Sequence, residues 1–168
     1  MTGQERLSNI CIKAPNLGEL YNLKVRHYTI KEHTLNVYNQ FETYFSNWFM
    51  EIDIELFRLI LLLHDVGKPI ASKSGNQSSQ HLYTLNIISE HREILGISDE
   101  NIVLINSLLS DDLLGLYMQN KITLERAYER ILNLSRISKL EFSAFFYLLS
   151  VYYQCDVASY TVDAGGLR

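Results

Sequence analysis

The sequence contains few of the residues that interrupt helices or cross-link chains. Among 168 residues there are 2 prolines, 8 glycines and 2 cysteines, and Cys11 and Cys155 form no CxxC pair. This cysteine usage excludes a disulfide framework and is typical of a reducing compartment. We therefore expect a reduced, cytoplasmic chain.

Long apolar runs and an excess of positive charge are also missing. The longest apolar run, residues 59–63, is far too short to span a bilayer, and the first ten residues contain no apolar stretch typical of a secretion signal. We expect no membrane partner. The formal net charge of -4 argues against a broad binding face for long nucleic acid, but not against a nucleotide or a nucleic-acid end. No feature of the sequence predicts an oligomeric state.

Helical periodicity, by contrast, covers most of the chain. Hydrophobic residues make up 47 % and charged residues 20 %, which is the balance of a globular chain large enough for a core of its own. No segment shows sustained strand alternation. We predict an all-α fold, a single domain of about six to eight helices over residues 1–168 with its core at about 28–161.

Caps and apolar spacing place the individual helices. Thr29 and Glu32 have the spacing of a capping box, and the helix they open carries an apolar stripe of Leu35, Tyr38, Phe41, Phe45 and Trp48. A buried central helix is predicted from about Asp53 to Gly67, with Gly67 as its stop.

The remaining helices follow the same signals. They are predicted at 78–95 with Leu82, Leu85, Ile88 and Leu95 inward, after Ser98, after Thr123, and from Ser138, where Glu141 would complete a second capping box. The segment between the helices after Ser98 and Thr123 is predicted as a loop with a short helix.

The segment LLLHDVGKP, residues 61–69, places His64 and Asp65 at the end of the most apolar helix. A carboxylate is disfavoured at the carbonyl end of a helix unless a cation lies beside it. Lys68 can turn back toward the same point, and a cation site beside an ammonium is a candidate phosphate receptor. The plain alternative is an exposed Asp65 and a His64 that bonds a backbone carbonyl.

Two further polar residues accompany the apolar stripes. The stripe of the last helix, through Phe145 and Leu149, continues to Asp156, where a carboxylate is costly unless it is paired or bound to metal. His33 lies in the first turn after Thr29. The plain alternatives are a solvated Asp156 and a His33 that is either hydrogen-bonded within the fold or at the surface. Two imidazoles and two carboxylates from three helices would suit Mn, Fe, Co, Ni or Zn better than Mg; the set is His33, His64, Asp65 and Asp156.

The order and helical context of EHTLNVYNQF, LLLHDVGKP and YYQCDVASY resemble the H…HD…D signature of HD-domain metal-dependent phosphohydrolases, over about residues 28–161. The HDxGKP form is similar to HD modules fused to tRNA nucleotidyltransferases and to polynucleotide-kinase proteins. The resemblance implies an HD-type helical bundle in which the two histidines and two aspartates bind a first metal. It also implies that Lys68 contacts phosphate.

The same resemblance raises the question of a second metal, bridged by Asp65. His81 would be the first of its further ligands, but the chain reads LLSDDLLG where a second histidine is expected. Asp111 or Asp112 would have to substitute. We therefore expect one metal ion and leave a second open.

These assignments predict an enzyme that hydrolyses a small phosphate ester, in the first place a phosphomonoester of a nucleotide or of a nucleic-acid end. The metal would polarise a phosphoryl oxygen and activate water, and Lys68 would offset charge on the phosphoryl oxygens. An aspartate such as Asp65, or His81 if it is not a ligand, would protonate the leaving oxygen. The alternative is a non-catalytic module that acts as a nucleotide sensor or an interaction scaffold.

Overall fold

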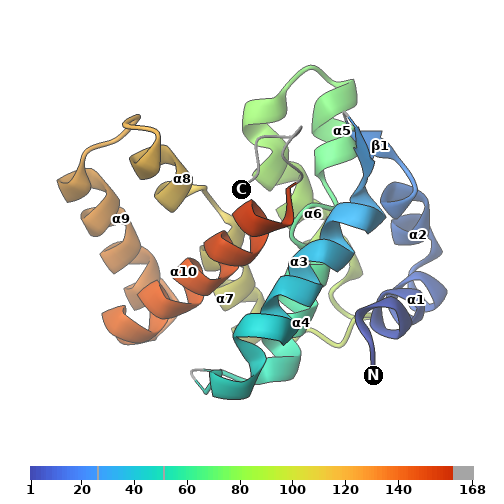
Figure 1. Cartoon of the computed structure of the whole chain (residues 1–168), viewed down its shortest axis with the longest axis horizontal. Helices are drawn as coiled ribbons and strands as arrows, with labels where there is room; N and C mark the ends of the chain where they lie inside the picture. Colours follow the sequence, from blue (N-terminus) through green and yellow to red (C-terminus); the bar gives the residue numbers. More distant parts are fainter. Residues whose placement is uncertain (26, 51, 161–168) are drawn as a thin grey trace.

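A computed structural model describes residues 1–25, 27–50 and 52–160, and the predicted all-α fold is confirmed (Figure 1). The helices are α1 (Gly3–Lys13), α2 (Pro15–Tyr21), α3 (Ile30–Tyr44), α4 (Ile54–Leu63), α5 (Lys68–Lys73), α6 (Gln80–His91), α7 (Asp99–Leu109), α8 (Leu113–Met118), α9 (Leu124–Ile137) and α10 (Phe142–Ser159). The strands β1 (Lys24–Val25) and β2 (Tyr28–Thr29), of two residues each, pair antiparallel as a hairpin. Short 3-10 helices lie at Ser46–Trp48 and Gln77–Ser79. Within the described ranges, no helix is both long and apolar enough to cross a membrane.

Helices α3, α4 and α10 form the centre of the molecule. Helix α3 packs against both α4 and α10, while α1 and α2 cover α3 on one side and α8 and α9 flank α10 on the other (Figure 1). Helix α4 is apolar nearly all round, and Phe57, Ile60, Leu61 and Leu63 have no exposed surface. Burial of that much apolar area is the main force that holds the three central helices together.

Local capping chemistry decides where several helices begin. Thr29 and Glu32 form the predicted capping box: the N–H of Glu32 donates to the Thr29 hydroxyl, and the N–H of Thr29 donates to the Glu32 carboxylate. Ser98 and Thr123 cap α7 and α9, as predicted, because their hydroxyl oxygens accept from the N–H groups of Asn101 and Arg126. The β1–β2 hairpin leads directly into the Thr29 cap, which fixes the first turn of α3.

The predicted capping box at Ser138 and Glu141 is wrong. Helix α10 begins at Phe142 with Glu141 as its N-cap, and the Ser138 hydroxyl donates to the carbonyl of Leu134 at the end of α9. Lys139 then adopts a left-handed conformation, with φ of 57°. Ser138 therefore ends one helix instead of starting the next, because its hydroxyl finds a carbonyl one turn behind it.

The central helix ends earlier than predicted. Helix α4 stops at Leu63, and Gly67 is not its left-handed stop, because its φ of -84° is right-handed and it precedes α5. Two side chains donate to backbone carbonyls of the last turn of α4. The Tyr21 hydroxyl donates to the carbonyl of Leu62, and the His64 ring donates to the carbonyl of Leu61. His64 and Asp65 therefore lie in a turn between two helices instead of inside one.

Gly67 is required by a close approach between this turn and α6. A Cβ at this position would lie 2.2 Å from the backbone nitrogen of Thr84 and 2.6 Å from the carbonyl carbon of Tyr83. The Gly67 N–H also donates to the Thr84 hydroxyl at 3.1 Å. The contact with α6 thus holds the turn that carries His64 and Asp65.

Two predicted inward residues prove to be exposed. Trp48 lies beyond the end of α3 and is 81 % exposed, and Leu82 on α6 is 53 % exposed. Helices α1, α2 and α5 and the β1–β2 hairpin were not predicted. Strands of two residues are too short to show alternation, whereas α1 does carry a readable signal, the capping box of Thr2 and Glu5.

Candidate metal centre

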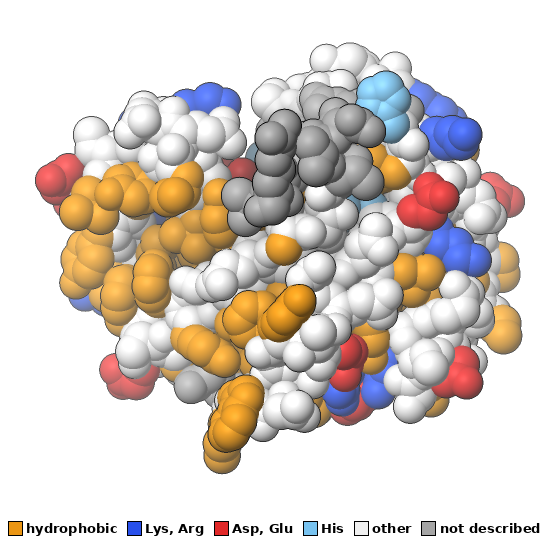
Figure 2. Space-filling view, in the orientation of Figure 1, with side chains coloured by type: hydrophobic (Ala, Val, Ile, Leu, Met, Phe, Trp, Pro, Cys, Tyr) orange, Lys and Arg blue, Asp and Glu red, His pale blue; other side chains and the backbone are white. Residues whose placement is uncertain are grey.

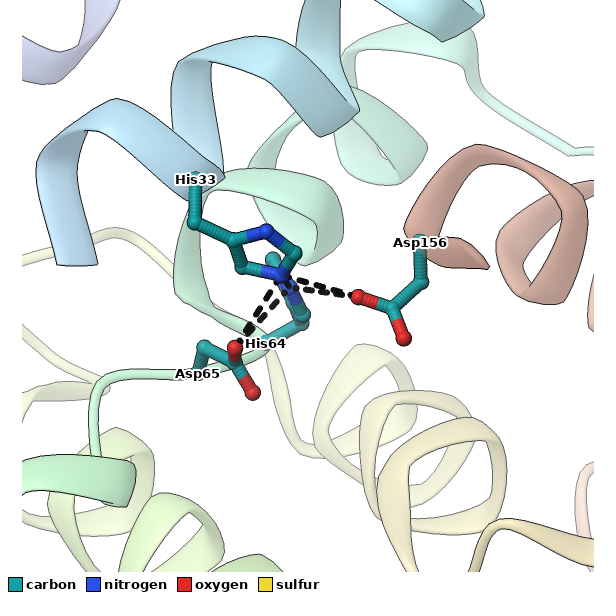
Figure 3. A group of neighbouring side chains, drawn as sticks. All are labelled: His33, His64, Asp65 and Asp156. Carbon is teal, nitrogen blue, oxygen red and sulfur yellow. Dashed lines mark hydrogen bonds and ion pairs between the residues drawn. The ribbon is translucent and has the colours of Figure 1, made fainter. Parts of the chain in front are cut away.

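Three segments far apart in the sequence bring four polar side chains to one point. His33 comes from the first turn of α3, His64 and Asp65 from the turn after α4, and Asp156 from the last turns of α10 (Figure 3). One ligand atom from each side chain can be chosen so that all four lie within 4.8 Å of one another. His33, His64 and Asp65 are buried, and Asp156 is partly exposed, so the point is reached from the Asp156 side.

The ligand atoms face one another directly. His33 Nε2 lies 2.9 Å from Asp156 Oδ1 and 3.2 Å from Asp65 Oδ2. His64 Nε2 lies 3.5 Å and 3.6 Å from the same two oxygens, and the two Nε2 atoms are 3.4 Å apart. Two ligands at about 2.1 Å from a metal are separated by roughly 3.0–3.4 Å when they subtend 90–110°, so the set has the dimensions of a coordination shell.

The hydrogen bonds behind the rings select the ligand tautomer of both histidines. His64 Nδ1 lies 2.7 Å from the Leu61 carbonyl, which only accepts, so Nδ1 carries the proton and Nε2 presents its lone pair. His33 Nδ1 lies 3.1 Å from the Ser159 hydroxyl, which itself donates to the Asp156 carbonyl at 2.6 Å and therefore accepts from the ring. Such a partner behind each ring is typical of metal-binding histidines.

The charges at this point are strongly coupled. Burial alone would raise the pKa of Asp65, but Lys68, His64 and His33 outweigh it and hold that pKa well below its usual value. Burial also acts to raise the pKa of Asp156, and hydrogen bonds from the two histidines lower it on balance. Both carboxylates are therefore ionised at neutral pH. In the metal-free protein a protonated imidazole donates to these carboxylates through Nε2. A divalent cation would replace that proton and be held by two anionic oxygens and two imidazole Nε2 atoms.

Lys68 lies where the sequence predicts it, beside the cluster but outside it. It is the first residue of α5, and its Nζ donates to Asp65 Oδ2 at 2.7 Å and to the Tyr160 hydroxyl at 2.9 Å. Burial lowers the pKa of Lys68, but Asp65, Tyr160 and Tyr28 together outweigh burial and raise it. The side chain is therefore a permanent cation next to the candidate metal position.

A family model described as HD domain matches residues 30–137 of this sequence. The chain belongs to the HD-domain family. The members of this family are generally metal-dependent phosphohydrolases, and HD domains bind divalent metals. The matched range contains His33, His64 and Asp65 and ends before Asp156, which α10 brings to the same point. No curated protein and no solved structure matches the chain.

A cavity of about 660 Å³ opens beside the cluster of this HD domain, and His64, Asp65 and Asp156 lie on its wall. Lys68 and the three candidates for a second metal line it: His81, Asp111 and Asp112. Among the described residues, however, these three do not join the cluster or form another of its kind. Asp111 pairs with Arg130, and the Asp112 carboxylate accepts from the N–H of Gly115 to cap α8. A second metal therefore stays a prediction.

Sequence reasoning missed two residues of the HD site. Ser159 holds the ring of His33, and Tyr160 contacts both Lys68 and His33. The sequence did contain a signal for both residues: Ser159 follows Asp156 by three residues on the same face of α10, and Tyr160 comes directly after the helix. The bonding of His64 to a backbone carbonyl, offered as the plain alternative, does occur, but through Nδ1, and it leaves Nε2 for the site.

Proposed function

We propose that this HD domain is a metal-dependent phosphohydrolase that acts on a phosphomonoester of a nucleotide or of a nucleic-acid end. The observation that carries the proposal is the position of the Lys68 ammonium, 2.7 Å from Asp65 and on the wall of the 660 Å³ cavity. A substrate that reached the metal ligands through this cavity would place its phosphoryl group against a fixed cation. An interaction scaffold has no need of such an arrangement.

The residues divide into those that would hold a metal and those that would act on the substrate. The two histidines and two aspartates of the cluster are the proposed ligands: His33, His64, Asp65 and Asp156. When bound, a divalent cation supplies Lewis acidity toward the phosphoryl oxygens and favours ionisation of water. Lys68 would donate to a phosphoryl oxygen and stabilise the charge that develops there.

The proton for the leaving oxygen is better supplied by Asp112 or His81 than by Asp65. The lowered pKa of Asp65 keeps that carboxyl ionised, and its oxygen already accepts from Lys68. Burial raises the pKa of Asp112, and the nearby charge of Asp156 acts in the same direction, so Asp112 carries a proton at higher pH than an ordinary aspartate. Both Asp112 and His81 line the cavity.

The cavity supports a substrate of nucleotide size. Its volume lies within the range of small-molecule sites, roughly 300–1,000 Å³. Its wall combines amide side chains, among them Gln77, Gln80 and Gln119, with the aromatic rings of Tyr152 and Tyr153. Amides suit the polar edges of a base or a sugar, and rings suit its flat face.

The proposal is tested with a substrate panel. The chain, loaded separately with Mn, Co and Ni, is incubated with nucleoside 5′- and 3′-monophosphates, with short oligonucleotides phosphorylated at either end, and with bis(4-nitrophenyl) phosphate as a diester. Metal-dependent release of inorganic phosphate from a monoester is the expected result. Hydrolysis of the diester alone would correct the substrate class. Nucleotide binding without turnover under every metal would contradict the proposal and favour the sensor.

The panel also needs a pair of variants that shows whether the measured activity comes from this site. His64→Gln removes a proposed ligand, and His91→Gln makes the same chemical change on α6, where the His91 ring bonds the Ile87 carbonyl and lies outside the cavity lining. Activity lost in His64→Gln and kept in His91→Gln would assign the turnover to this site. Equal activity in both would assign it to a contaminant.

A further inference from the structure

Tyr160, directly after α10, touches two groups of the site at once. Its hydroxyl oxygen accepts from the Lys68 ammonium at 2.9 Å. Its ring stacks on the His33 imidazole, with centroids 4.4 Å apart and an interplanar angle of 29°. The residue therefore joins the group proposed to meet the phosphoryl oxygens to one of the proposed metal ligands.

Most of the bonding capacity of Lys68 is already committed. An ammonium has three N–H donors, and here Asp65 and Tyr160 each take one, which leaves one for a ligand. The rings of Tyr160 and Tyr28 lie 5.3 and 5.8 Å from Nζ and add a cation–π attraction. These contacts fix the direction of the remaining donor.

Without these contacts the Lys68 ammonium could turn into a second cavity. Lys68 and Tyr160 both line the 660 Å³ cavity and also a smaller one of about 230 Å³, whose wall includes Ser72, Gln77 and Gln80. The hydroxyl and amide groups of that wall can accept from an ammonium, and the lysine side chain has a flexible four-carbon stem. The Tyr160 hydroxyl, together with Asp65, keeps the charge near the metal ligands.

We propose that Tyr160 is a positioning residue for hydrolysis. Its hydroxyl holds the Lys68 ammonium toward the phosphoryl group of the substrate, and its ring holds the His33 imidazole in the orientation needed for metal binding. This inference rests on the proposed function.

Two substitutions separate the hydroxyl from the ring. Tyr160→Phe keeps the stacking on His33 and removes the oxygen, so kcat for a phosphomonoester should fall about tenfold, the worth of one hydrogen bond to a charged group, while metal affinity is unchanged. Tyr160→Leu also removes the ring and should weaken metal binding in addition. The control is Tyr147→Phe, which removes a hydroxyl from α10 outside the cavity lining. Wild-type kcat in Tyr160→Phe, or an equal loss in Tyr147→Phe, would overturn the proposal.

A second measurement is independent of turnover. The metal-free proteins are treated with sulfosuccinimidyl acetate, and acetylation of Lys68 is followed by mass spectrometry relative to the exposed Lys73. The unprotonated amine attacks the ester and expels N-hydroxysulfosuccinimide. Without the Tyr160 oxygen the Lys68 side chain is held less firmly, so its amine should react at least about threefold faster in Tyr160→Phe and at the wild-type rate in Tyr147→Phe. Unchanged reactivity of Lys68 in Tyr160→Phe would overturn the positioning role. If the wild-type protein hydrolyses no phosphate ester but this footprint changes as expected, the proposed function fails while the contact between Tyr160 and Lys68 stands.

Discussion

At the scale of single residues, the site depends on which nitrogen of each histidine remains available after the other has formed a hydrogen bond. His64 gives Nδ1 to the Leu61 carbonyl and keeps Nε2 for the site, and His33 divides its nitrogens in the same way between Ser159 and the cluster. The sequence predicts that these histidines and aspartates converge, because polar residues at the ends of apolar stripes need partners. It could not predict the partners behind the rings, because they depend on where the α4 turn and the end of α10 lie.

Lys68→Met tests the residue proposed to meet the phosphoryl group. Methionine keeps much of the side-chain length and removes the cation, so the fold and the metal content should be retained. The account predicts that kcat falls roughly ten- to a thousandfold, about 1.4 to 4 kcal/mol, because the lost contact strengthens as charge develops in the transition state. Steady-state kinetics of the metal-loaded variant measures this. Turnover equal to that of wild type would mean that Lys68 has no catalytic part.

The metal-free protein should lose stability as pH rises above neutrality. Burial lowers the pKa of His33, but hydrogen bonds to Asp156 and Asp65 outweigh it, and the pKa in the folded state lies above the unfolded value of about 6.5. The stabilisation is therefore fully present below that value and is lost as pH rises through the folded pKa.

Thermal denaturation in the presence of a chelator, between about pH 6 and pH 9, measures this effect. The melting temperature of the wild-type chain should fall across that range, and His33→Gln should show less of the fall. Added metal should reverse the trend, because metal competes with protons for the same nitrogen. A melting temperature that rises equally in both metal-free proteins would contradict the pairing of His33 with the carboxylates.

At the scale of elements, three helix starts that depend on local chemistry were predicted correctly, whereas the end of α4 was not. Thr29, Ser98 and Thr123 cap helices through groups within three residues, so the sequence carries the whole signal. The end of α4 depends instead on a hydroxyl from α2 and a contact with α6, which sequence spacing does not contain. The turn that carries His64 and Asp65 was consequently placed inside a helix by the sequence analysis.

Gly67→Ala tests whether the contact with α6 holds that turn. The added Cβ would lie within 2.6 Å of two backbone atoms of α6, so the two segments must separate. We expect the free energy of unfolding to fall by about 1–3 kcal/mol, the usual cost of overpacking, and metal affinity to weaken because His64 and Asp65 move with the turn. Chemical denaturation and metal titration measure the two effects.

The matched control for this substitution is Gly18→Ala in α2. A Cβ at Gly18 would meet the Cys11 side chain at 3.4 Å, an ordinary contact, and alanine favours the helix by about 1 kcal/mol over glycine. Gly18→Ala should therefore leave stability unchanged or raise it. If Gly67→Ala behaved like this control, the approach of the turn to α6 would not be a constraint on the site.

At the scale of the whole molecule, the distribution of charge limits the size of the substrate. The net charge is -4, and on the face drawn in Figure 2 the Lys and Arg side chains are scattered, while apolar side chains gather over α9 and α10. The exposed members of that apolar group include Leu124, Tyr128, Ile137 and Phe146. Among the described residues two lysines, Lys68 and Lys121, line the cavity, and no row of cations lies on this face, which suits a terminal phosphate and not a duplex backbone.

Salt dependence of binding measures the number of phosphate contacts. Affinity for a 5′-phosphorylated oligonucleotide should fall with salt at a slope of about one contact, and should hardly change when the oligonucleotide is lengthened, because only its end is bound. Fluorescence anisotropy at several salt concentrations gives the slope. A slope of about five or more contacts, or a strong preference for duplex, would instead require a binding groove along the chain.

The central claim is that the four converging side chains hold a divalent metal on which hydrolysis of a phosphate ester depends. The most direct test is to titrate Mn into the metal-free chain while both bound metal and phosphate release from a monoester are measured in the same samples. The account predicts that turnover rises with occupancy and saturates near one ion per chain. It also predicts that Asp156→Asn binds at least about a hundredfold more weakly and shows no turnover at the same metal concentration. Wild-type protein that reaches full occupancy without hydrolysing any monoester, or Asp156→Asn that matches it in both measurements, would contradict the claim.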